Sequence, residues 1–309
     1  MPIRYHVYRL AIFTFSLWVS GLATHTSHAE TVTPNQVYQV TEDVLAQLER
    51  LHDANLSIPN LMNVETNLPD RQPRHVLQQA LNVRSKIQLL KRVNGLEPSE
   101  IKPPKVKEVT PSDVLIEVQT ILNELTEFDK TFNLPPFKKQ AKAVEGKTPT
   151  DVYLNLLRAQ AMIVQLGIPD TIPNEVFNNV LSVSEEIKLV AAASNKKTDV
   201  EPPSPSIGKR PADAYSLAYY ALKGLKGLTR KPEYKIPNDI VLPKRKTRNI
   251  TSSDVQQLLL FCLAELSSMK VAVGATAPLM MPKPAAGQTP TTVFDKLGLV
   301  NRQIQAMVW

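Results

Sequence analysis

Residues 110–128 read TPSDVLIEVQTILNELTEF, and residues 148–166 read TPTDVYLNLLRAQAMIVQL. Both segments open with threonine and proline, carry an acidic residue two places later, and continue with apolar residues at steps of three and four. Threonine followed by proline is a helix start, because proline lacks an N–H and has a preset φ. The acidic residue can complete a capping box and faces the positive end of the helix dipole. The two segments therefore predict two amphipathic helices with one start signal.

The same pattern occurs eight times when the cap residue is counted as position zero. The caps are Thr33, Gln72, Thr110, Thr148, Ile172, Arg210, Thr251 and Thr289. Position one is proline in every copy except the seventh, which has Ser252. Position four is valine in every copy except the sixth, which has Ala214. So many coincident copies indicate an internal repeat rather than chance periodicity.

An apolar stripe runs along each copy at positions four, eight, eleven, fifteen and eighteen. In the third copy these positions hold Val114, Val118, Ile121, Leu125 and Phe128. Steps of four and three keep the side chains on one face of a helix, so we expect this stripe to form the core. The first copy departs from the pattern at position eight, where Thr41 stands.

Most connectors between the copies are about 20 residues long and rich in proline and lysine, as in residues 102–107, KPPKVK, and 201–205, EPPSP. Structureless loops of this length are unusual inside compact domains, so we expect ordered, extended runs along the helices. In polyproline geometry, at ~3.1 Å per residue, such a run can return along a whole helix. Successive helices can therefore be parallel or antiparallel. The pattern does not match tetratricopeptide repeats, whose helices are joined by short turns.

The fourth connector, residues 167–171, is much shorter than the others. It spans at most ~18 Å, less than one helix, which predicts that the fourth and fifth helices form an antiparallel hairpin. Copies one to four also align with copies five to eight. We therefore expect an all-α fold of eight amphipathic helices in a repeat array or bundle, with halves at residues 30–168 and 169–309. The halves could share one core or form two subdomains.

Residues 1–29 have the pattern of a cleavable signal peptide. Arg4 and Arg9 precede a mostly apolar run, residues 10–23, and small residues precede the predicted cleavage after Ala29. The apolar run is shorter than the ~20 residues of a membrane span. We expect an exported protein, periplasmic or extracellular, and no later segment that is apolar and long enough to span a membrane.

Basic residues gather in the connectors. Loss of Arg4 and Arg9 with the signal peptide would lower the formal charge from +7 to +5. The connector residues are Lys102, Lys105, Lys107, Lys138, Lys139, Lys142, Lys196, Lys197, Arg230, Lys231, Lys235, Lys244, Arg245, Lys246 and Arg248. They could bind an anionic polymer, or they could only keep proline-rich segments solvated. Few aromatic residues lie among them, which argues against nucleic acid.

Candidates for chemistry are few. After cleavage the histidines are His52, expected on the surface at a helix end, and His75, at the acidic position of the second copy. The only cysteine, Cys262, lies on the core stripe without a neighbour that favours the thiolate. Glu185 and Glu186 are adjacent and so point in different directions on a helix. The sequence predicts no catalytic, cofactor-binding or metal-binding residues and therefore a non-enzyme.

Gly224 and Gly227 lie in the sixth helix and indicate either close helix packing or an early helix end. The functional hypothesis is an exported, non-enzymatic helical-repeat protein that binds or scaffolds a protein partner in the cell envelope, since such repeats build regular binding surfaces. Two alternatives stay open. One is a basic matrix protein that binds anionic polymers, and the other is a hydrolase with an unrecognised carboxylate site. The oligomeric state is not predicted.

Overall fold

The computed structural model describes residues 31–62, 64–279 and 282–308. The chain divides into two units, Met1–Thr31 and Val32–Trp309. The predicted signal peptide at residues 1–29 lies outside the described residues. All the described helices belong to the second unit.

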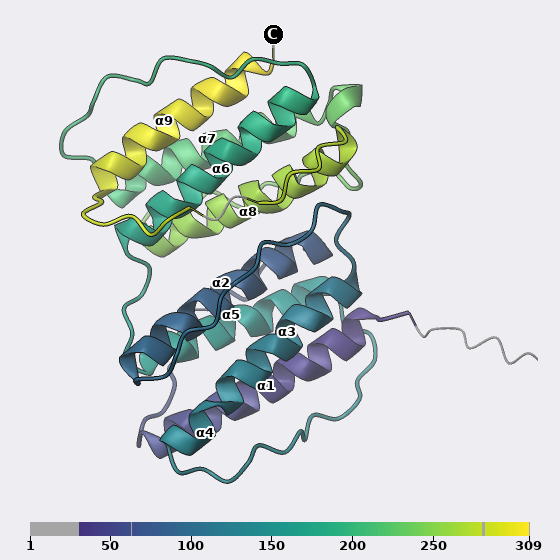
Figure 1. The fold of residues 1–309 in the computed structure, drawn as a ribbon, viewed down its shortest axis with the longest axis vertical. Helices are drawn as coiled ribbons and strands as arrows, with labels where there is room; N and C mark the ends of the chain where they lie inside the picture. The colour runs from purple at the N-terminus through teal and green to yellow at the C-terminus, as the bar shows by residue number, and fades with distance from the viewer. Residues whose placement is uncertain (1–30, 63, 280–281, 309) are drawn as a thin grey trace, which may run out of the picture. The chain divides into compact units, whose positions relative to one another are not determined.

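The described part of the chain is all-helical, as predicted, with no strand among its residues. Each long helix begins one residue after a predicted cap (Figure 1). The helices are α1 (Pro34–Ala54), α2 (Pro73–Val93), α3 (Pro111–Thr126), α5 (Pro149–Gln165), α6 (Pro173–Ala193), α7 (Pro211–Leu228), α8 (Ser252–Ala272) and α9 (Pro290–Ala306). A short helix, α4 (Phe128–Thr131), follows α3, and a 3-10 turn, η1 (Pro232–Tyr234), follows α7.

The helix starts are held mainly by the side chain at position three. Asp113 accepts the backbone N–H of Thr110 at 2.9 Å, and Asp151 accepts that of Thr148 at 2.8 Å. The Thr110 hydroxyl donates to the same carboxylate at 2.8 Å. The threonine oxygen also accepts from the first turn at two helix starts. Thr148 accepts from the Asp151 N–H and Thr289 accepts from the Thr292 N–H, both at 3.3 Å. The capping box thus works chiefly through its acidic arm.

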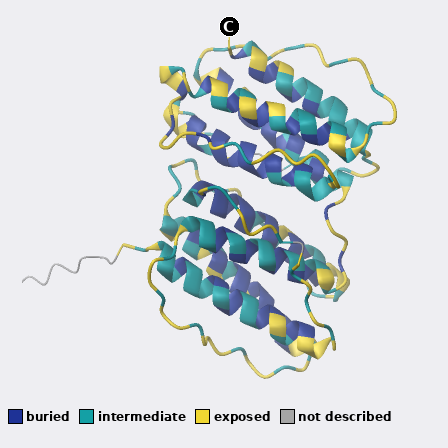
Figure 2. Cartoon of the chain, turned by 180° about the vertical axis from the view of Figure 1, so that it is seen from behind, coloured by how far each residue is buried: buried dark blue, intermediate teal, exposed yellow. Residues whose placement is uncertain are grey.

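The apolar stripe forms the core, as expected. In the third copy Val118, Ile121, Leu125 and Phe128 are fully buried. Figure 2 shows buried residues along the helices and exposed residues along the connectors. Thr41, the departure from the pattern, is also buried, with its hydroxyl donating to the Tyr38 carbonyl at 2.7 Å.

The helices pack as two groups of four, α1, α2, α3 and α5 in the first and α6, α7, α8 and α9 in the second. Within the first group all four helices run in the same direction. The prolines at position one and the valines at position four converge around one small space, which is lined by Pro34, Val37, Pro73, Val76, Pro111, Val114, Pro149 and Val152. The sequence left the direction open, and the structure makes the helices of this group parallel.

The second group is parallel as well. The Ser184 hydroxyl, twelve residues after its cap, donates to Gln303, fourteen residues after its own cap, at 2.9 Å. Gly224 and Ile304 stand at similarly matched positions of α7 and α9 and lie in contact. In parallel neighbouring helices, residues that are equally far from their caps lie at the same level of the bundle.

Extended connectors return the chain along the helices, as predicted. Beside α1, the backbone N–H groups of Gln140 and Ala141 donate to Asp43, both at 2.9 Å, and that of Lys147 donates to Asn35 at 2.8 Å. The connector therefore runs antiparallel to α1, from its middle to its start. Polar side chains on the helices satisfy the backbone groups of a segment that belongs to no helix or sheet.

The prediction that the fourth and fifth helices form an antiparallel hairpin is right about their direction and wrong about their pairing. α5 packs against α1 and α2, whereas α6 packs against α8 and α9. The short link between α5 and α6 reverses the direction of the chain, so the helices of the second group run opposite to those of the first. His75, near the start of α2, contacts Glu265, late in α8, and Lys86, late in α2, contacts Glu175, at the start of α6. Because each apolar stripe is covered within its own group, the link joins two groups instead of closing a hairpin.

The groups meet through α2 and α8, which lie side by side (Figure 1). By length and composition α8 is apolar enough to cross a membrane, so the statement that no later segment qualifies is wrong. In the structure 78% of its apolar window is buried. α8 packs against α6, α7 and α2, which explains why apolar residues such as Leu260 and Phe261 lie outside the stripe.

Candidate functional site

The two histidines of the described chain are both buried. His52, expected on the surface, is 1% exposed, with Nε2 3.0 Å from the Met162 carbonyl and Nδ1 2.8 Å from the Ser57 hydroxyl. His75 accepts the Gln72 backbone N–H at Nδ1 and places Nε2 2.7 Å from Glu265. His75 thus fills the capping position that an acid holds in other copies. Both rings are occupied by structural contacts.

Glu265 joins the two groups at their junction. It accepts from Arg74 Nε at 2.9 Å and from His75 at 2.7 Å, and all three residues are buried. Burial lowers the pKa of His75, and the nearby Arg74 and Arg71 act in the same direction, while Glu265 opposes them. The ring is therefore held neutral, and the Arg74–Glu265 pair supplies the charge balance.

The remaining candidates for chemistry are also structural. Cys262 is fully buried on the core stripe, and burial raises the pKa of its thiol far above the ordinary value. Glu185 pairs with Lys188 on the exposed side of α6, whereas the buried Glu186 pairs with Lys270 of α8 at 2.7 Å. The two adjacent acids thus point apart, as predicted. The described residues include no group of His, Cys, Asp and Glu that could hold a metal ion.

Glycine at position 224 reflects close packing. A Cβ there would lie 2.8 Å from Ile304 Cγ2, and α7 continues past it to Leu228. Gly298 serves a similar purpose in α9, where a Cβ would lie 2.8 Å from Pro203 of the connector. The prolines at 201–205 therefore include one that packs directly on a helix.

Several connector lysines make intramolecular contacts. Lys107 pairs with the capping Asp113 at 2.6 Å, and Lys246 pairs with Asp254 at 2.9 Å. Lys147 lies over the Tyr38 ring at 4.3 Å. Other basic residues of the connectors are exposed, namely Lys102, Lys105, Lys138, Lys139, Lys142, Lys197, Arg230, Lys235, Lys244 and Arg248. The exposed residues are spread over several connectors rather than gathered at one cavity.

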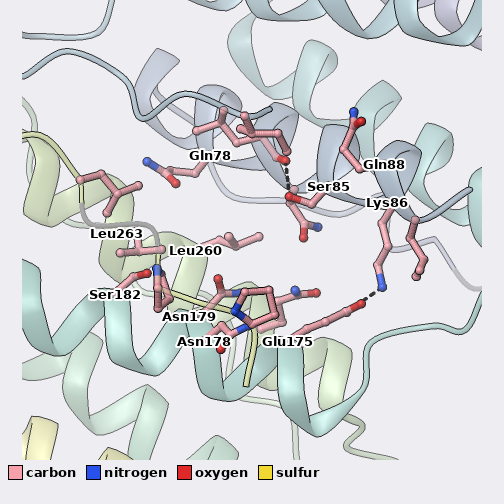
Figure 3. A pocket seen from close by; sticks show the side chains of 18 of the residues that line it. Gln78, Ser85, Lys86, Gln88, Glu175, Asn178, Asn179, Ser182, Leu260 and Leu263 are labelled. Atoms are coloured by element: carbon pink, nitrogen blue, oxygen red, sulfur yellow. Dashed lines mark hydrogen bonds and ion pairs between the residues drawn. The ribbon is translucent and has the colours of Figure 1, made fainter. Parts of the chain in front are cut away.

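A cleft of about 560 Å³ opens where the two groups meet. One wall is α2, the other is α6 and α8, and the rim includes connector residues 99–101 with Leu279, Pro282 and Pro284 (Figure 3). The lining combines carboxamides with leucines, among them Gln78, Asn82, Asn179, Gln256, Leu260 and Leu263. Its size falls in the range of about 300–1,000 Å³ that is typical of ligand sites.

Gln78 is the distinctive residue of this cleft. Its side chain is 5% exposed, lines the cavity, and has no hydrogen-bond partner in the described part of the chain. Gln256, 3% exposed, accepts from the Thr171 hydroxyl at 2.8 Å through Oε1 only. The amide atoms without a partner in these two residues are not among the fully enclosed atoms of the described chain, so they face the cleft and can bind a ligand or water.

The ion pair of Lys86 and Glu175, 2.7 Å apart, bridges the two walls at one end of the cleft (Figure 3). The two charges neutralise each other, and Arg92 and Glu100 add one charge of each sign to the lining. The cleft therefore presents mixed, balanced charge rather than a basic surface.

The cleft residues share no local pattern in the sequence. They come from helices that are distant in sequence, and their meeting depends on how α2 docks against α8. One signal was available in the run LLLFCLA at residues 258–264, whose apolar residues exceed what a single stripe needs. No known protein family, curated protein or solved structure matches the chain.

Proposed function

We propose that this chain is an exported, non-enzymatic binding or scaffold protein of the cell envelope, periplasmic or extracellular, that holds a protein partner in the cleft between its two helix groups. The observation that carries the proposal is the cleft itself, lined by Gln78, whose amide makes no hydrogen bond within the described chain. Export is inferred from the signal-peptide pattern of residues 1–29.

The absence of enzyme activity is part of the proposal. It is supported by the structural use of the groups that catalysis most often needs. His75 and Glu265 bind each other, and Cys262 is enclosed in the core. Leucines and carboxamides, which line the cleft, are suited to binding rather than to proton transfer.

The test is capture of partners by tagged residues 30–309 from envelope extract of the source organism, with washes at low and high salt. Ser85 lines the cleft on the exposed side of α2, so Ser85→Trp should obstruct it. Thr120→Trp is the matched control, because Ser85 and Thr120 both donate to the carbonyl four residues earlier in their helices.

We expect the wild type and Thr120→Trp to capture one protein that stays bound during the high-salt wash. Ser85→Trp should not capture it. Equal capture by all three would contradict the cleft as the binding site. Capture only of anionic polymer, released by salt, would instead favour binding through the exposed lysines of the connectors.

A further inference from the structure

We infer that the cleft takes an extended peptide segment of the partner, and that the Gln78 carboxamide binds one backbone peptide unit of that segment. This inference rests on the proposed function. It names the chemical form in which the partner enters the cleft.

The protein already uses carboxamides in this way. Gln165 of α5 binds the extended connector at Asn60 twice, accepting from its backbone N–H at 2.7 Å and donating to its carbonyl at 3.0 Å. A carboxamide has a donor and an acceptor side by side, so it can match both groups of one peptide residue. The helices of this fold are therefore suited to binding extended backbone through their carboxamide side chains.

Gln78 stands at a repeat position that holds extended backbone elsewhere. Six residues after the cap, Gln39 donates to the Ala141 carbonyl at 2.7 Å. At the same position of the fifth copy, Asn178 accepts from the Ala285 N–H at 3.1 Å. The eighth copy has Asp295 there, which accepts from the Ser206 N–H at 3.1 Å.

Gln78 is the corresponding residue of the second copy, and no connector group of the described chain hydrogen-bonds to it. The connector after α2 instead contacts the later part of that helix, where the Ser99 N–H donates to Gln88 at 2.6 Å. A cavity thus replaces the extended segment that position six holds in three of the seven other copies, the first, fifth and eighth. The remaining four copies have Ile116, Leu154, Ser216 and Gln257 there, which make no hydrogen bond to connector backbone in the described chain. An extended segment from outside the chain can occupy it.

The walls suit the side chains of such a segment. Figure 3 shows Gln78 extending from α2 toward Leu263, with Leu260 beside it on α8. An extended chain points alternate side chains to opposite faces, so backbone can bind Gln78 while apolar side chains contact these leucines. The balanced charge of Lys86 and Glu175 favours an uncharged ligand over an anionic one.

The experiment selects a display library of random linear twelve-residue peptides on immobilised residues 30–309. Selected peptides are synthesised, and their affinities are measured by fluorescence anisotropy. We expect peptides with apolar residues at alternating positions that bind the wild type but not Ser85→Trp. A library that yields no peptide sensitive to Ser85→Trp would overturn the inference while leaving the capture of a folded partner as a separate result.

The role of Gln78 is tested with Gln78→Leu, which retains bulk but removes both amide groups. Its unfolding midpoint should stay close to that of the wild type, because the Gln78 amide makes no hydrogen bond within the described chain that the substitution would remove. Peptide affinity should fall at least about fivefold, since the bound peptide unit would lose its partner. Gln119→Leu is the control, because Gln119 is an exposed glutamine of α3, remote from the cleft lining.

Peptides methylated at single backbone nitrogens separate a hydrogen bond from a merely structural role. At one position, methylation should weaken binding to the wild type and to Gln119→Leu but leave binding to Gln78→Leu unchanged. Two results would overturn the assignment of Gln78 as the residue that binds the peptide backbone. One is an equal loss of peptide affinity for all three proteins at every methylated position. The other is wild-type affinity of Gln78→Leu for the unmethylated peptide.

Discussion

Gly224 of α7 and Ile304 of α9 touch so closely that a Cβ at position 224 would lie 2.8 Å from Ile304 Cγ2. Gly227, one turn later in the same helix, has no such neighbour within 4 Å. The two glycines therefore form a matched pair that differs only in packing. Their contrast reports on the parallel arrangement of α7 and α9.

Gly224→Ala should destabilise the protein by about 1–3 kcal/mol, because the added methyl group overpacks the contact with Ile304. Gly227→Ala should be neutral or stabilise by up to about 1 kcal/mol, since alanine is the better helix former. Urea unfolding of both variants measures the difference. Equal effects would show that α7 and α9 do not meet at residue 224.

The core stripe is tested in α3. Ile121 is fully buried, whereas Ile116 is 64% exposed. Ile121→Ala should lower the free energy of unfolding by about 2–5 kcal/mol. Ile116→Ala should change it by less than about 0.5 kcal/mol. A small effect at Ile121 would remove that position from the core, and Ile187→Ala provides the corresponding test in α6.

The junction of the two groups depends on Glu265. Glu265→Gln leaves the buried Arg74 without its countercharge and should cost about 3–5 kcal/mol in chemical unfolding. Glu185→Gln is the control, because its partner Lys188 lies on the exposed surface of α6. Similar midpoints for the two variants would argue against a buried ion pair at the junction.

Acidification should weaken the fold through His75. Burial lowers its pKa, so the unfolded chain takes up a proton at higher pH than the folded one. The stabilising contribution of the neutral ring is complete above the unfolded pKa of about 6.5 and is lost as the pH falls toward the lowered folded value. The free energy of unfolding should therefore decrease between pH 7 and pH 5. His75→Gln should reduce this slope, and an unchanged slope would assign the pH dependence to other groups.

Local signals in the sequence predicted the helices well. Caps such as Thr110 and Thr148 locate helix starts, and the spacing of Val118, Ile121 and Leu125 defines the buried face. These features depend on neighbours within one or two turns. The pairing of helices was not predictable in the same way, because connectors of about 20 residues reach either end of a neighbouring helix.

The cleft depends on long-range packing. Gln78 and Leu263 lie far apart in sequence and come together only because the two groups run in opposite directions and meet through α2 and α8. The predicted pairing of the fourth and fifth helices failed for a related reason. A short link limits how far apart two successive helices lie and in which direction they run, but it does not determine whether their apolar faces pack against each other. Besides the apolar run at residues 258–264, a second signal in the sequence was position six of the repeat, where Gln39 of the first copy corresponds to Gln78 of the second.

Protection of the cleft by its partner is measured most directly by alkylation of an introduced thiol. Cys262 is fully buried, so a Ser85→Cys variant of residues 30–309 would carry one accessible cysteine, and Thr120→Cys provides the control. The captured partner should slow iodoacetamide labelling at position 85 and leave the rate at position 120 unchanged. Labelling at position 85 that is equally fast with and without bound partner would contradict a binding site between the two helix groups.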